Sequence, residues 1–206
     1  MKPHHWIALA IIVLATFALS ACSRAPATGP NVMIKVGDGH GSGVFIGNGI
    51  IITAAHVVGA NGTVDLLLDD GTEMKGRVLW ANTQYDIAAI RPDDSSGMAW
   101  ANLSCTVPQN GEEITAVGNP TAFKFLTMWG KVAGTLDEML PWLEAVPVDM
   151  TVIPGMSGGG VFNARGEVVG ISVGTAIMPF GFGATWLRIG IIVPGKTVCD
   201  LMGRVA

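Results

Sequence analysis

The chain has 206 residues and a formal net charge of −4, with 50% apolar and 14% charged residues. A weakly acidic chain lacks the positive surface that binds nucleic acids, so we expect no nucleic-acid partner. The apolar fraction is too high for a disordered chain, and the length suits one domain or two small barrels that share a core.

Residues 1–21 predict a secretory signal peptide that ends in a lipoprotein cleavage site. Lys2 precedes the uncharged, mostly apolar run Trp6–Leu19, which is shorter than the roughly 20 residues that span a bilayer. The run ends in "LSAC", Leu19–Cys22, which resembles the bacterial lipoprotein signal. We therefore predict cleavage before Cys22 and attachment of lipid to its sulfur. The alternative is an ordinary signal peptide cut near Ala21, with Cys22 incidental.

Residues 22–30 predict a lipidated tether, because "SRAPATGP" after Cys22 is rich in Pro and Ala and has no periodicity. Several acyl chains on one cysteine would anchor the protein stably to a membrane. The expected location is the cell envelope, facing the periplasm or the exterior. Ser23 resembles the outer-membrane sorting signal of Gram-negative lipoproteins, which favours the outer membrane. Cleavage also removes Lys2 and changes the formal charge from −4 to −5.

Residues 31–206 predict an all-β domain, because Gly, Asn and Asp separate short apolar stretches at regular intervals. A first barrel is expected at about 31–91. "GNG" at Gly47–Gly49 predicts a hairpin, and "DDGT" at Asp69–Thr72 predicts a turn. Its six candidate strands are Asn31–Val36, Gly43–Ile46, Ile50–Thr53, Thr63–Leu68, Glu73–Trp80 and Ile87–Arg91.

A second barrel is expected at about 106–206, after the break "PDDSSG" at Pro92–Gly97. Its six candidate strands are Glu113–Val117, Leu126–Ala133, Leu143–Val148, Gly159–Asn163, Val168–Val173 and Gly190–Val193. Val198, Leu201, Met202 and Val205 recur at helical spacing and predict a short terminal helix. The predicted fold is therefore all-β, with two six-stranded antiparallel barrels and a short C-terminal helix.

Three residues have complementary chemistry. Ser157 lies in "PGMSGGG", His56 in "TAAHVV" and Asp86 in "YDIAAI". Taken singly, each has an ordinary structural explanation as a turn serine, a core histidine and a strand-start aspartate. Taken together they suit nucleophilic catalysis. A serine hydroxyl attacks only when a base takes its proton, and an imidazole can act as that base near neutral pH. A carboxylate fixes the tautomer of the imidazole.

In this order the segments resemble the trypsin-like (chymotrypsin-fold) serine proteases, most of all the bacterial HtrA/Deg protease domain. The resemblance runs from about Gly41 to the terminal helix. It implies two barrels with a cleft between them and hydrolysis of protein or peptide substrates through an acyl-enzyme. It also implies Ser157 as nucleophile, His56 as general base and acid, and Asp86 as the orienting acid. No cofactor and no metal are expected. The segments that carry it are "GSGVFIGNGIIITAAHVV", "YDIAAIRP", "EEITAVGNP", "KVAG", "PGMSGGGVFNARGEVVGIS" and "IGIIVP".

The same resemblance implies an oxyanion hole formed by the backbone amides of Gly155 and Ser157. The chain departs from the family at Met156, where Asp or Asn is usual, and at Gly160, where Pro is usual. Met156 offers no charge to a newly cut N-terminus. We therefore expect activity without zymogen cleavage, with the oxyanion turn held by packing. The sequence ends at Ala206, so a regulatory PDZ domain is not expected.

The resemblance implies a substrate pocket between the segment that leads to Ser157 and the strand after it, and these segments carry no charge. An unpaired basic side chain would be costly to bury there, and Ile153 and Val173 should narrow the space. We therefore expect cleavage after small or medium aliphatic residues such as Val, Ala or Leu. The predicted pocket residues are Thr151, Ile153, Pro154, Val173, Gly174, Thr175 and Gly190.

Two questions stay open in the sequence. A disulfide between the positions of Cys105 and Cys199 recurs in the trypsin family and suits an oxidising compartment, but two buried free thiols are the alternative.

The second function hypothesis is a catalytically weak or inactive protease-fold lipoprotein that serves as a binding module. Met156 favours it, and the complete set of Ser157, His56 and Asp86 argues against it.

Overall fold

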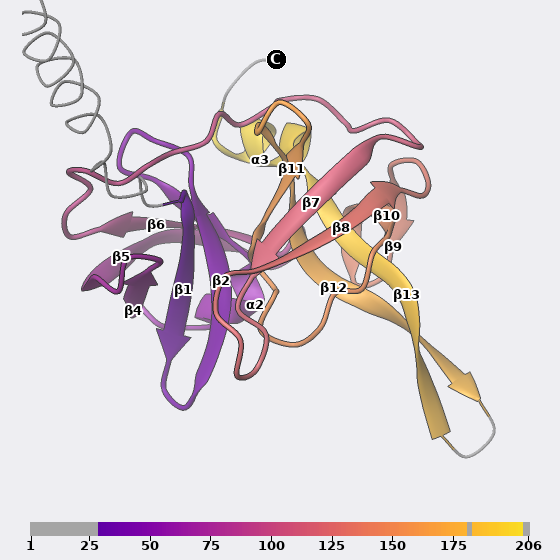
Figure 1. Ribbon diagram of the computed structural model, residues 1–206, viewed down its shortest axis with the longest axis horizontal. Helices are drawn as coiled ribbons and strands as arrows, with labels where there is room; N and C mark the ends of the chain where they lie inside the picture. The colour runs from indigo at the N-terminus through magenta and orange to yellow at the C-terminus, as the bar shows by residue number, and fades with distance from the viewer. Residues whose placement is uncertain (1–28, 181–182, 204–206) are drawn as a thin grey trace, which may run out of the picture.

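The computed structural model describes residues 29–180 and 183–203 as two β-structures that lie side by side (Figure 1). The predicted signal peptide, Cys22 and the tether as far as residue 28 lie outside the described residues. Within the described part of the chain, no helix has both the length and the apolar character of a membrane span.

The first structure is a closed antiparallel barrel of six strands in the order β1-β2-β3-β6-β5-β4. The hairpin between β2 and β3 turns at Asn48 and Gly49, which both have positive φ, as this tight turn requires. Strand β2 begins four residues before its predicted start, because Gly39–Ser42 continue the pairing with β1. The strands are β1 (Asn31–Val36), β2 (Gly39–Phe45), β3 (Ile51–Thr53), β4 (Thr63–Leu68), β5 (Glu73–Asn82) and β6 (Ile87–Pro92).

The second structure is a seven-stranded antiparallel sheet in the order β13-β12-β11-β7-β8-β10-β9. Strand β13 also pairs with β10, so six of the strands form a ring and β9 is an addition at β10. The strands are β7 (Glu113–Gly118), β8 (Leu126–Val132), β9 (Asp137–Met139), β10 (Trp142–Asp149), β11 (Gly160–Asn163), β12 (Val168–Phe180) and β13 (Gly183–Pro194).

The second sheet differs from the sequence expectation in two ways. Strand β9 was not predicted, because three residues, two of them acidic, carry too little pattern to identify a strand. Strands β12 and β13 run far beyond their predicted ends at Val173 and Gly190, and form a hairpin that projects from the body of the protein (Figure 1). Register shifts after Ser172 and Thr175 interrupt the alternation of side chains along this hairpin, which hid its length in the sequence.

Three hydrophobic cores organise the molecule. One fills the first barrel around Ile34, Ile51 and Leu66, and another fills the second structure around Val146, Met150 and Val169. The third combines residues of both structures, and we call it the inter-barrel core. Its buried members include Val44, Ile46, Ile52, Ala54, Ile87 and Ala89 from the first barrel and Ala145, Phe162, Val168, Ile171, Val173, Ile191, Val193 and Val198 from the rest of the chain. The shared core fixes how the two structures meet.

The terminal helix α3 (Gly195–Leu201) closes the second structure. Its buried Cys199 forms a disulfide with Cys105, with the two Cα atoms 5.6 Å apart. Cys105 belongs to the connection between the two structures, so the bridge ties that connection to the end of the fold. The helix ends before Met202, and the predicted helical position Val205 lies outside the described residues.

Candidate functional site

His56 and Asp86 form a hydrogen-bonded pair at the edge of the first barrel. His56 lies on α2 (Ala55–Val58), a single turn that follows β3, and Asp86 directly precedes β6. The His56 Nδ1 atom lies 2.7 Å from Asp86 Oδ2, and the His56 backbone N–H donates to Asp86 Oδ1 at 2.9 Å. Two contacts to one carboxylate fix the imidazole ring and its backbone together. The other ring nitrogen, Nε2, is left available for chemistry.

Asp86 is buried and carries a strained backbone. Its residue is 8% exposed, and its φ of 56° lies in the left-handed region that non-glycine residues rarely occupy. Asp tolerates this region better than most residues, and such strain is often kept at functional sites. Trp142 Nε1 also donates to Asp86 Oδ2, at 3.1 Å. Sequence reasoning missed Trp142, because no motif marks it.

Ser157 lies on a turn that two left-handed glycines shape. Gly155 has φ of 96° and Gly158 has φ of 85°. The neighbouring amides are used inside the fold: Met156 N–H donates to Ile153 O at 3.0 Å, and Gly158 N–H donates to Ser172 O at 2.6 Å. In contrast, the N–H groups of Gly155 and Ser157 donate no hydrogen bond to the described residues. Two unengaged amides on either side of Met156 can serve as the donors of an oxyanion hole.

The Ser157 turn is joined directly to the first barrel. Ser42 N–H donates to Ser157 O at 2.8 Å. A Cβ on Gly158 would lie 2.1 Å from Ser42 O and 2.2 Å from Thr53 Oγ1. The backbone after Ser157 therefore passes against β2 and β3, next to the strand that leads into His56. The Ser157 turn thus lies against the end of β3, a few residues before His56 in the chain.

A buried polar network holds the other side of the turn. Ser42 Oγ donates to Gly155 O at 2.7 Å and accepts from Asn119 N–H at 2.9 Å and from Asn119 Nδ2 at 3.0 Å. Asn119 is fully buried, and its Oδ1 accepts from Phe125 N–H at 3.0 Å. The Asn119 carbonyl oxygen lies 2.8 Å from His40 Nε2. This network supplies the polar anchor that Met156 lacks.

Met156 itself holds the turn by packing. It is fully buried in the core of the second structure. A Cβ on Gly118, at the end of β7, would lie 2.8 Å from Met156 Cα. The turn is thus fixed both by the buried thioether side chain and by hydrogen bonds from Ser42 and Asn119. Only the first of these could be expected from the sequence, although "VGNP" around Asn119 was among the segments of the resemblance.

The segments predicted to form the substrate pocket converge. Thr175 pairs with Gly190 across β12 and β13, and a Cβ on Gly190 would lie 2.6 Å from Val152 Cγ2. Thr151 and Ile153 are partly exposed, and Pro154 is exposed. One residue differs from the expectation: Val173 is 2% exposed and packs in the inter-barrel core with Ile171, at the point where the register of β12 shifts. Gly174 lies against the Trp142 ring.

The hydroxyl of Ser157 forms no hydrogen bond with His56 or with any other residue in the described ranges. Such bonds are often long in unliganded enzymes and shorten when substrate binds. Ser172 Oγ, on the strand beneath the turn, is buried without a partner in the described ranges.

Within the described part of the chain, no group of three His, Cys, Asp or Glu side chains is placed to hold a metal ion.

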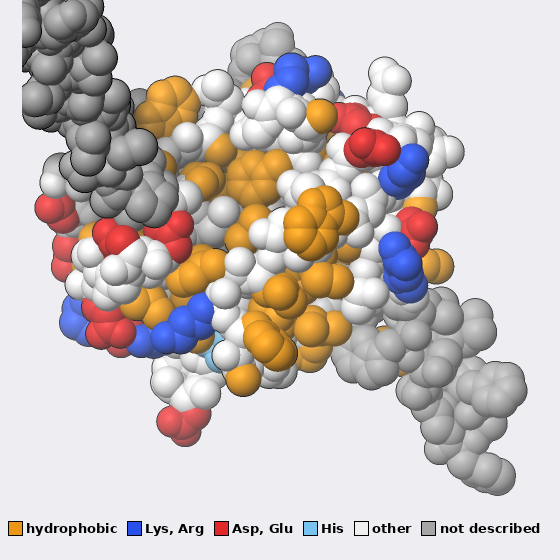
Figure 2. Space-filling model, in the orientation of Figure 1, with side chains coloured by type: hydrophobic (Ala, Val, Ile, Leu, Met, Phe, Trp, Pro, Cys, Tyr) orange, Lys and Arg blue, Asp and Glu red, His pale blue; other side chains and the backbone are white. Residues whose placement is uncertain are grey.

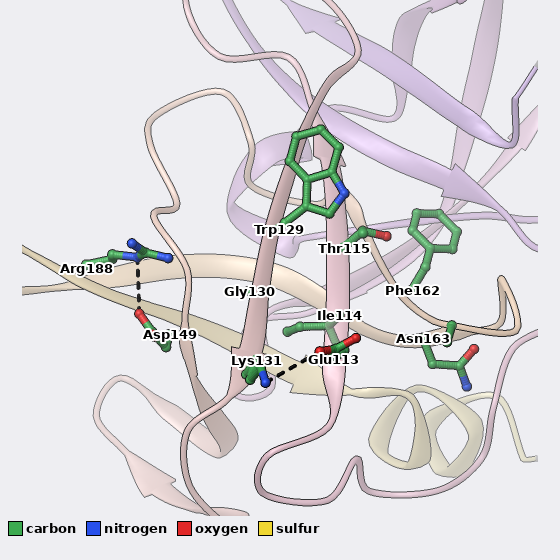
Figure 3. Close-up of a pocket in the computed structure, with 11 residues that line it drawn as sticks. Glu113, Ile114, Thr115, Trp129, Gly130, Lys131, Asp149, Phe162, Asn163 and Arg188 are labelled. Carbon is green, nitrogen blue, oxygen red and sulfur yellow. Dashed lines mark ion pairs between the residues drawn. The ribbon is translucent and has the colours of Figure 1, made fainter.

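Two pockets lie in very different chemical surroundings. One, of about 290 Å³, borders His56, Asp86 and Trp142. The other, of about 460 Å³, lies on the second structure over β7, β8 and β11, where Lys131 pairs with Glu113 and Arg188 pairs with Asp149 (Figure 3). The larger pocket is lined by no histidine, and Ser157 lines neither of the two. We therefore assign the candidate site to the His56–Asp86 pair and the Ser157 turn.

Exposed hydrophobic side chains gather on the face formed by β7 and β8 (Figure 2). Trp129 on β8 is 70% exposed and Phe123, in the connection between the two strands, is 62% exposed. Exposed apolar side chains of this size commonly mark interaction surfaces.

Comparison with known proteins gives a consistent result. The family model of the trypsin-like peptidase domain matches residues 41–171. The chain is similar to a "Probable periplasmic serine endoprotease DegP-like" from Rhizobium meliloti, with 30% identity over 166 residues, which cover 79% of this chain and 32% of the relative. A protein of the same name from Halomonas elongata is 30% identical over 136 residues, covering 64% of this chain and 28% of the relative. The chain thus spans about a third of the length of these relatives.

The fold also matches a solved structure, that of the inactive form of Rv3671c from M. tuberculosis H37Rv, a serine-to-alanine mutant. The TM-score is 0.69, and the match covers 84% of this chain and 85% of the other at 18% sequence identity. At that identity the likeness concerns the fold alone. The family model, in contrast, spans more than half of the sequence, including His56, Asp86 and Ser157. The chain belongs to the trypsin-like peptidase domain family.

Proposed function

We propose that this protein is a serine endopeptidase of the HtrA type, with Ser157 as nucleophile, His56 as general base and acid, and Asp86 as orienting acid. The observation that carries the proposal is the double contact of Asp86 with His56, at 2.7 Å to Nδ1 and 2.9 Å from the backbone N–H. That contact holds a histidine at the junction where the Ser157 turn meets the first barrel. The names of the relatives support the same activity.

The reaction follows from these groups. Ser157 Oγ attacks the carbonyl carbon of the scissile peptide while His56 Nε2 takes the hydroxyl proton. The C–N bond then breaks, His56 returns the proton to the leaving amine, and an acyl-enzyme remains. Water then attacks the ester while His56 takes its proton, and His56 returns this proton to Ser157 Oγ as the acid product leaves. Asp86 accepts from His56 Nδ1 and stabilises the imidazolium.

The oxyanion of each tetrahedral intermediate would lie between the N–H groups of Gly155 and Ser157. These amides are unengaged within the described residues, so no bond must break before they donate. Loss of one such donor typically raises the barrier by about 3 kcal/mol. Because Ser42 and Asn119 fix the Gly155 carbonyl, the turn needs no charged N-terminus to hold it. We therefore propose activity without zymogen cleavage.

The predicted pocket supports a preference for small or medium aliphatic residues before the scissile bond. Its proposed lining remains Thr151, Ile153, Pro154, Gly174, Thr175 and Gly190, without Val173, and none of these residues carries a charge. A Lys or Arg side chain would find no partner, which costs several kcal/mol. Cleavage of a peptide library dominated by Lys or Arg before the cut would contradict this reading.

The location is a further part of the proposal. We propose that residues 1–21 are a signal peptide, that 22–30 are a tether lipidated at Cys22, and that 31–206 are the protease domain in the cell envelope. The name of the relatives, which includes "periplasmic", supports the compartment. Metabolic labelling with a radioactive fatty acid should mark the wild-type protein and leave Cys22→Ala unlabelled. Equal labelling of both would contradict the lipid anchor.

The alternative is a protease-fold protein that binds partners without cutting them, and the missing hydrogen bond between Ser157 and His56 favours it. A fluorophosphonate probe separates the two, because it reacts only with an activated serine. We expect wild-type protein to be labelled and Ser157→Ala to remain unlabelled, with casein cleaved only by the former. A folded wild-type protein that neither reacts nor cleaves would support the binding module.

A further inference from the structure

Trp142 occupies a position that the proposed mechanism does not use. It opens β10, directly after the exposed Leu140 and Pro141, and its side chain is half-buried. Leu143 N–H donates to Gln84 O of the first barrel at 3.3 Å. The start of β10, which belongs to the second structure, is therefore tied to the segment of the first barrel that carries Asp86.

The indole nitrogen of Trp142 contacts the carboxylate that orients His56. Asp86 Oδ2 accepts from Trp142 Nε1 at 3.1 Å, and the same oxygen lies 2.7 Å from His56 Nδ1. The Asp86 side chain is 11% exposed, so few water molecules can replace a lost donor. A hydrogen bond to an ionised group is stronger than one between neutral groups, and it also fixes direction. The indole thus limits rotation of the carboxylate about its side-chain bond.

The carbocyclic ring of Trp142 contacts a second part of the site. A Cβ on Gly174 would lie 2.7 Å from Trp142 Cη2 and 2.8 Å from Cζ2, so the ring rests on the backbone of β12. Strand β11 pairs with β12 only as far as Ile171. The next residue, Ser172, bonds to Gly158 and Gly159 of the Ser157 turn. A peptide that adds to this edge of β12 as a strand would run past Gly174. The ring therefore covers the place where the substrate chain would run past Gly174.

We propose that Trp142 is a positioning residue for the His56–Asp86 pair and, through its ring, sets the size of the substrate side chain that fits beside Gly174. This inference rests on the proposed serine endopeptidase. Its two parts come from different atoms of one side chain. The N–H group acts on Asp86, and the ring acts on the substrate, so a substitution that keeps the ring separates them.

The test uses Trp142→Phe, which keeps a ring but removes the donor, and Trp142→Ala, which removes both. Trp129→Phe is the matched control, because Trp129 is 70% exposed and lies on β8, in the pocket that holds none of the three proposed reactive groups. Each folded variant is compared by its rate of fluorophosphonate labelling and by kcat and KM on peptides. The peptides carry Ala or Phe at each of three positions N-terminal to the scissile bond.

We expect Trp142→Phe to lower the labelling rate and kcat about three- to tenfold, as for loss of one net hydrogen bond, with KM and side-chain preference nearly unchanged. Trp142→Ala should lower the labelling rate at least as much and raise kcat/KM for Phe relative to Ala at one of the three positions. A labelling rate for Trp142→Phe equal to that of Trp129→Phe would overturn the positioning role. An unchanged Phe-to-Ala preference in Trp142→Ala would overturn the role in specificity.

A measurement without catalysis separates this inference from the proposed function. In ¹⁵N-tryptophan-labelled protein, the indole N–H signal that disappears in Trp142→Phe belongs to Trp142. We expect that signal to exchange with deuterium more slowly than that of Trp129, and to shift in Asp86→Ala. If wild-type protein does not react with the probe but the signal behaves as expected, the contact stands and the enzyme assignment fails. A fast-exchanging signal insensitive to Asp86→Ala would overturn the contact itself.

Discussion

The two β-structures differ in regularity, and the difference matches what each contributes to the site. The first is a closed barrel in which every strand pairs on both sides. It supplies His56 and Asp86, which must keep a fixed mutual geometry. The second has an added strand, β9, and the long β12–β13 hairpin. It supplies the Ser157 turn, the pocket segments and Trp142, where substrate is expected to bind.

The His56–Asp86 pair and the segments expected to bind substrate lie on different β-structures, so their relative placement depends on the contact between the two. We call this contact the joint. It consists of the inter-barrel core and the close approach of Gly158 to Ser42 and Thr53.

Removing a proposed reactive group from either body should have the largest effect. We expect Ser157→Ala, from the second structure, and His56→Ala, from the first, each to reduce casein hydrolysis by roughly 10⁴-fold or more. The double variant should be no worse than either single one, because the groups act as a unit. Rates are measured at matched concentration after circular dichroism confirms folding. If the fold-reduction in the double variant equals the product of the two single reductions, Ser157 and His56 act independently and the proposal is contradicted.

The joint should be the most sensitive point for stability. Gly158→Ala would place a Cβ 2.1 Å from Ser42 O at a φ of 85°. We expect a loss of about 3–5 kcal/mol in the free energy of unfolding, measured by urea denaturation. Gly166→Ala is the control, because Gly166 has a similar φ of 74° but no atom within 4 Å of the added Cβ. Similar losses at both glycines would mean that backbone strain, and not the close contact between the bodies, dominates.

Removal of the disulfide should have the next largest effect on the free energy of unfolding. Cys105 and Cys199 are 94 residues apart in sequence, and chain-entropy models give about 4–5 kcal/mol for closing such a loop. Replacing both with Ala should lower the free energy of unfolding by about 2–4 kcal/mol. The wild-type protein in a strong reductant should show a similar loss, while the double variant should not respond to reductant. A variant as stable as the oxidised wild type would show that the bridge contributes nothing.

Asn119→Ala should affect both stability and catalysis. It removes the Nδ2 donor to Ser42 Oγ and leaves Phe125 N–H without its acceptor, so we expect a loss of about 1–3 kcal/mol in the free energy of unfolding. A lower kcat with an unchanged KM should accompany it, because Ser42 Oγ, which donates to the Gly155 carbonyl, loses one of its two donors. Asn163→Ala is the control: Asn163 is also buried and accepts from Arg165 N–H and Glu167 N–H, but in a turn away from His56. Equal kcat losses in both variants would refute a specific role of Asn119.

The smallest effects are expected at exposed ion pairs, one on each body. A hydrogen bond from Lys35 lowers the pKa of Glu73, and hydrogen bonds from Arg165 and then Asn163 lower the pKa of Glu167. A lowered pKa in the folded state stabilises the protein above the ordinary glutamate range, and this contribution is lost as the pH falls to the folded value. Glu73→Gln and Glu167→Gln should each slightly flatten the acid side of a stability–pH curve. A steeper acid side in either variant would contradict the assigned direction.

The sequence correctly predicted the strands in which apolar and polar residues alternate clearly. It also singled out the candidate residues whose side chains have distinctive chemistry. The barrel strands from Asn31 to Arg91 were predicted to within two residues at each end, except for the first half of β2, because short loops with Gly and Asn mark most of their ends. His56, Asp86 and Ser157 were singled out because their residue types and their order resemble one family. Strand β9 and the outer part of the β12–β13 hairpin were missed, since short or bulged strands give no regular pattern.

What the sequence determined by itself was local: turn chemistry, side-chain alternation, the terminal helix and the identities of the candidate residues. The tertiary structure decided what depends on contacts between distant segments. It brought Cys105 to Cys199, moved Val173 from the expected pocket into the inter-barrel core, and placed Trp142 on Asp86. These outcomes could not be read from spacing, because the distance between two side chains far apart in the chain depends on how whole strands pack. A single tryptophan at the start of a strand carries no local signal of the carboxylate that it meets from the other barrel.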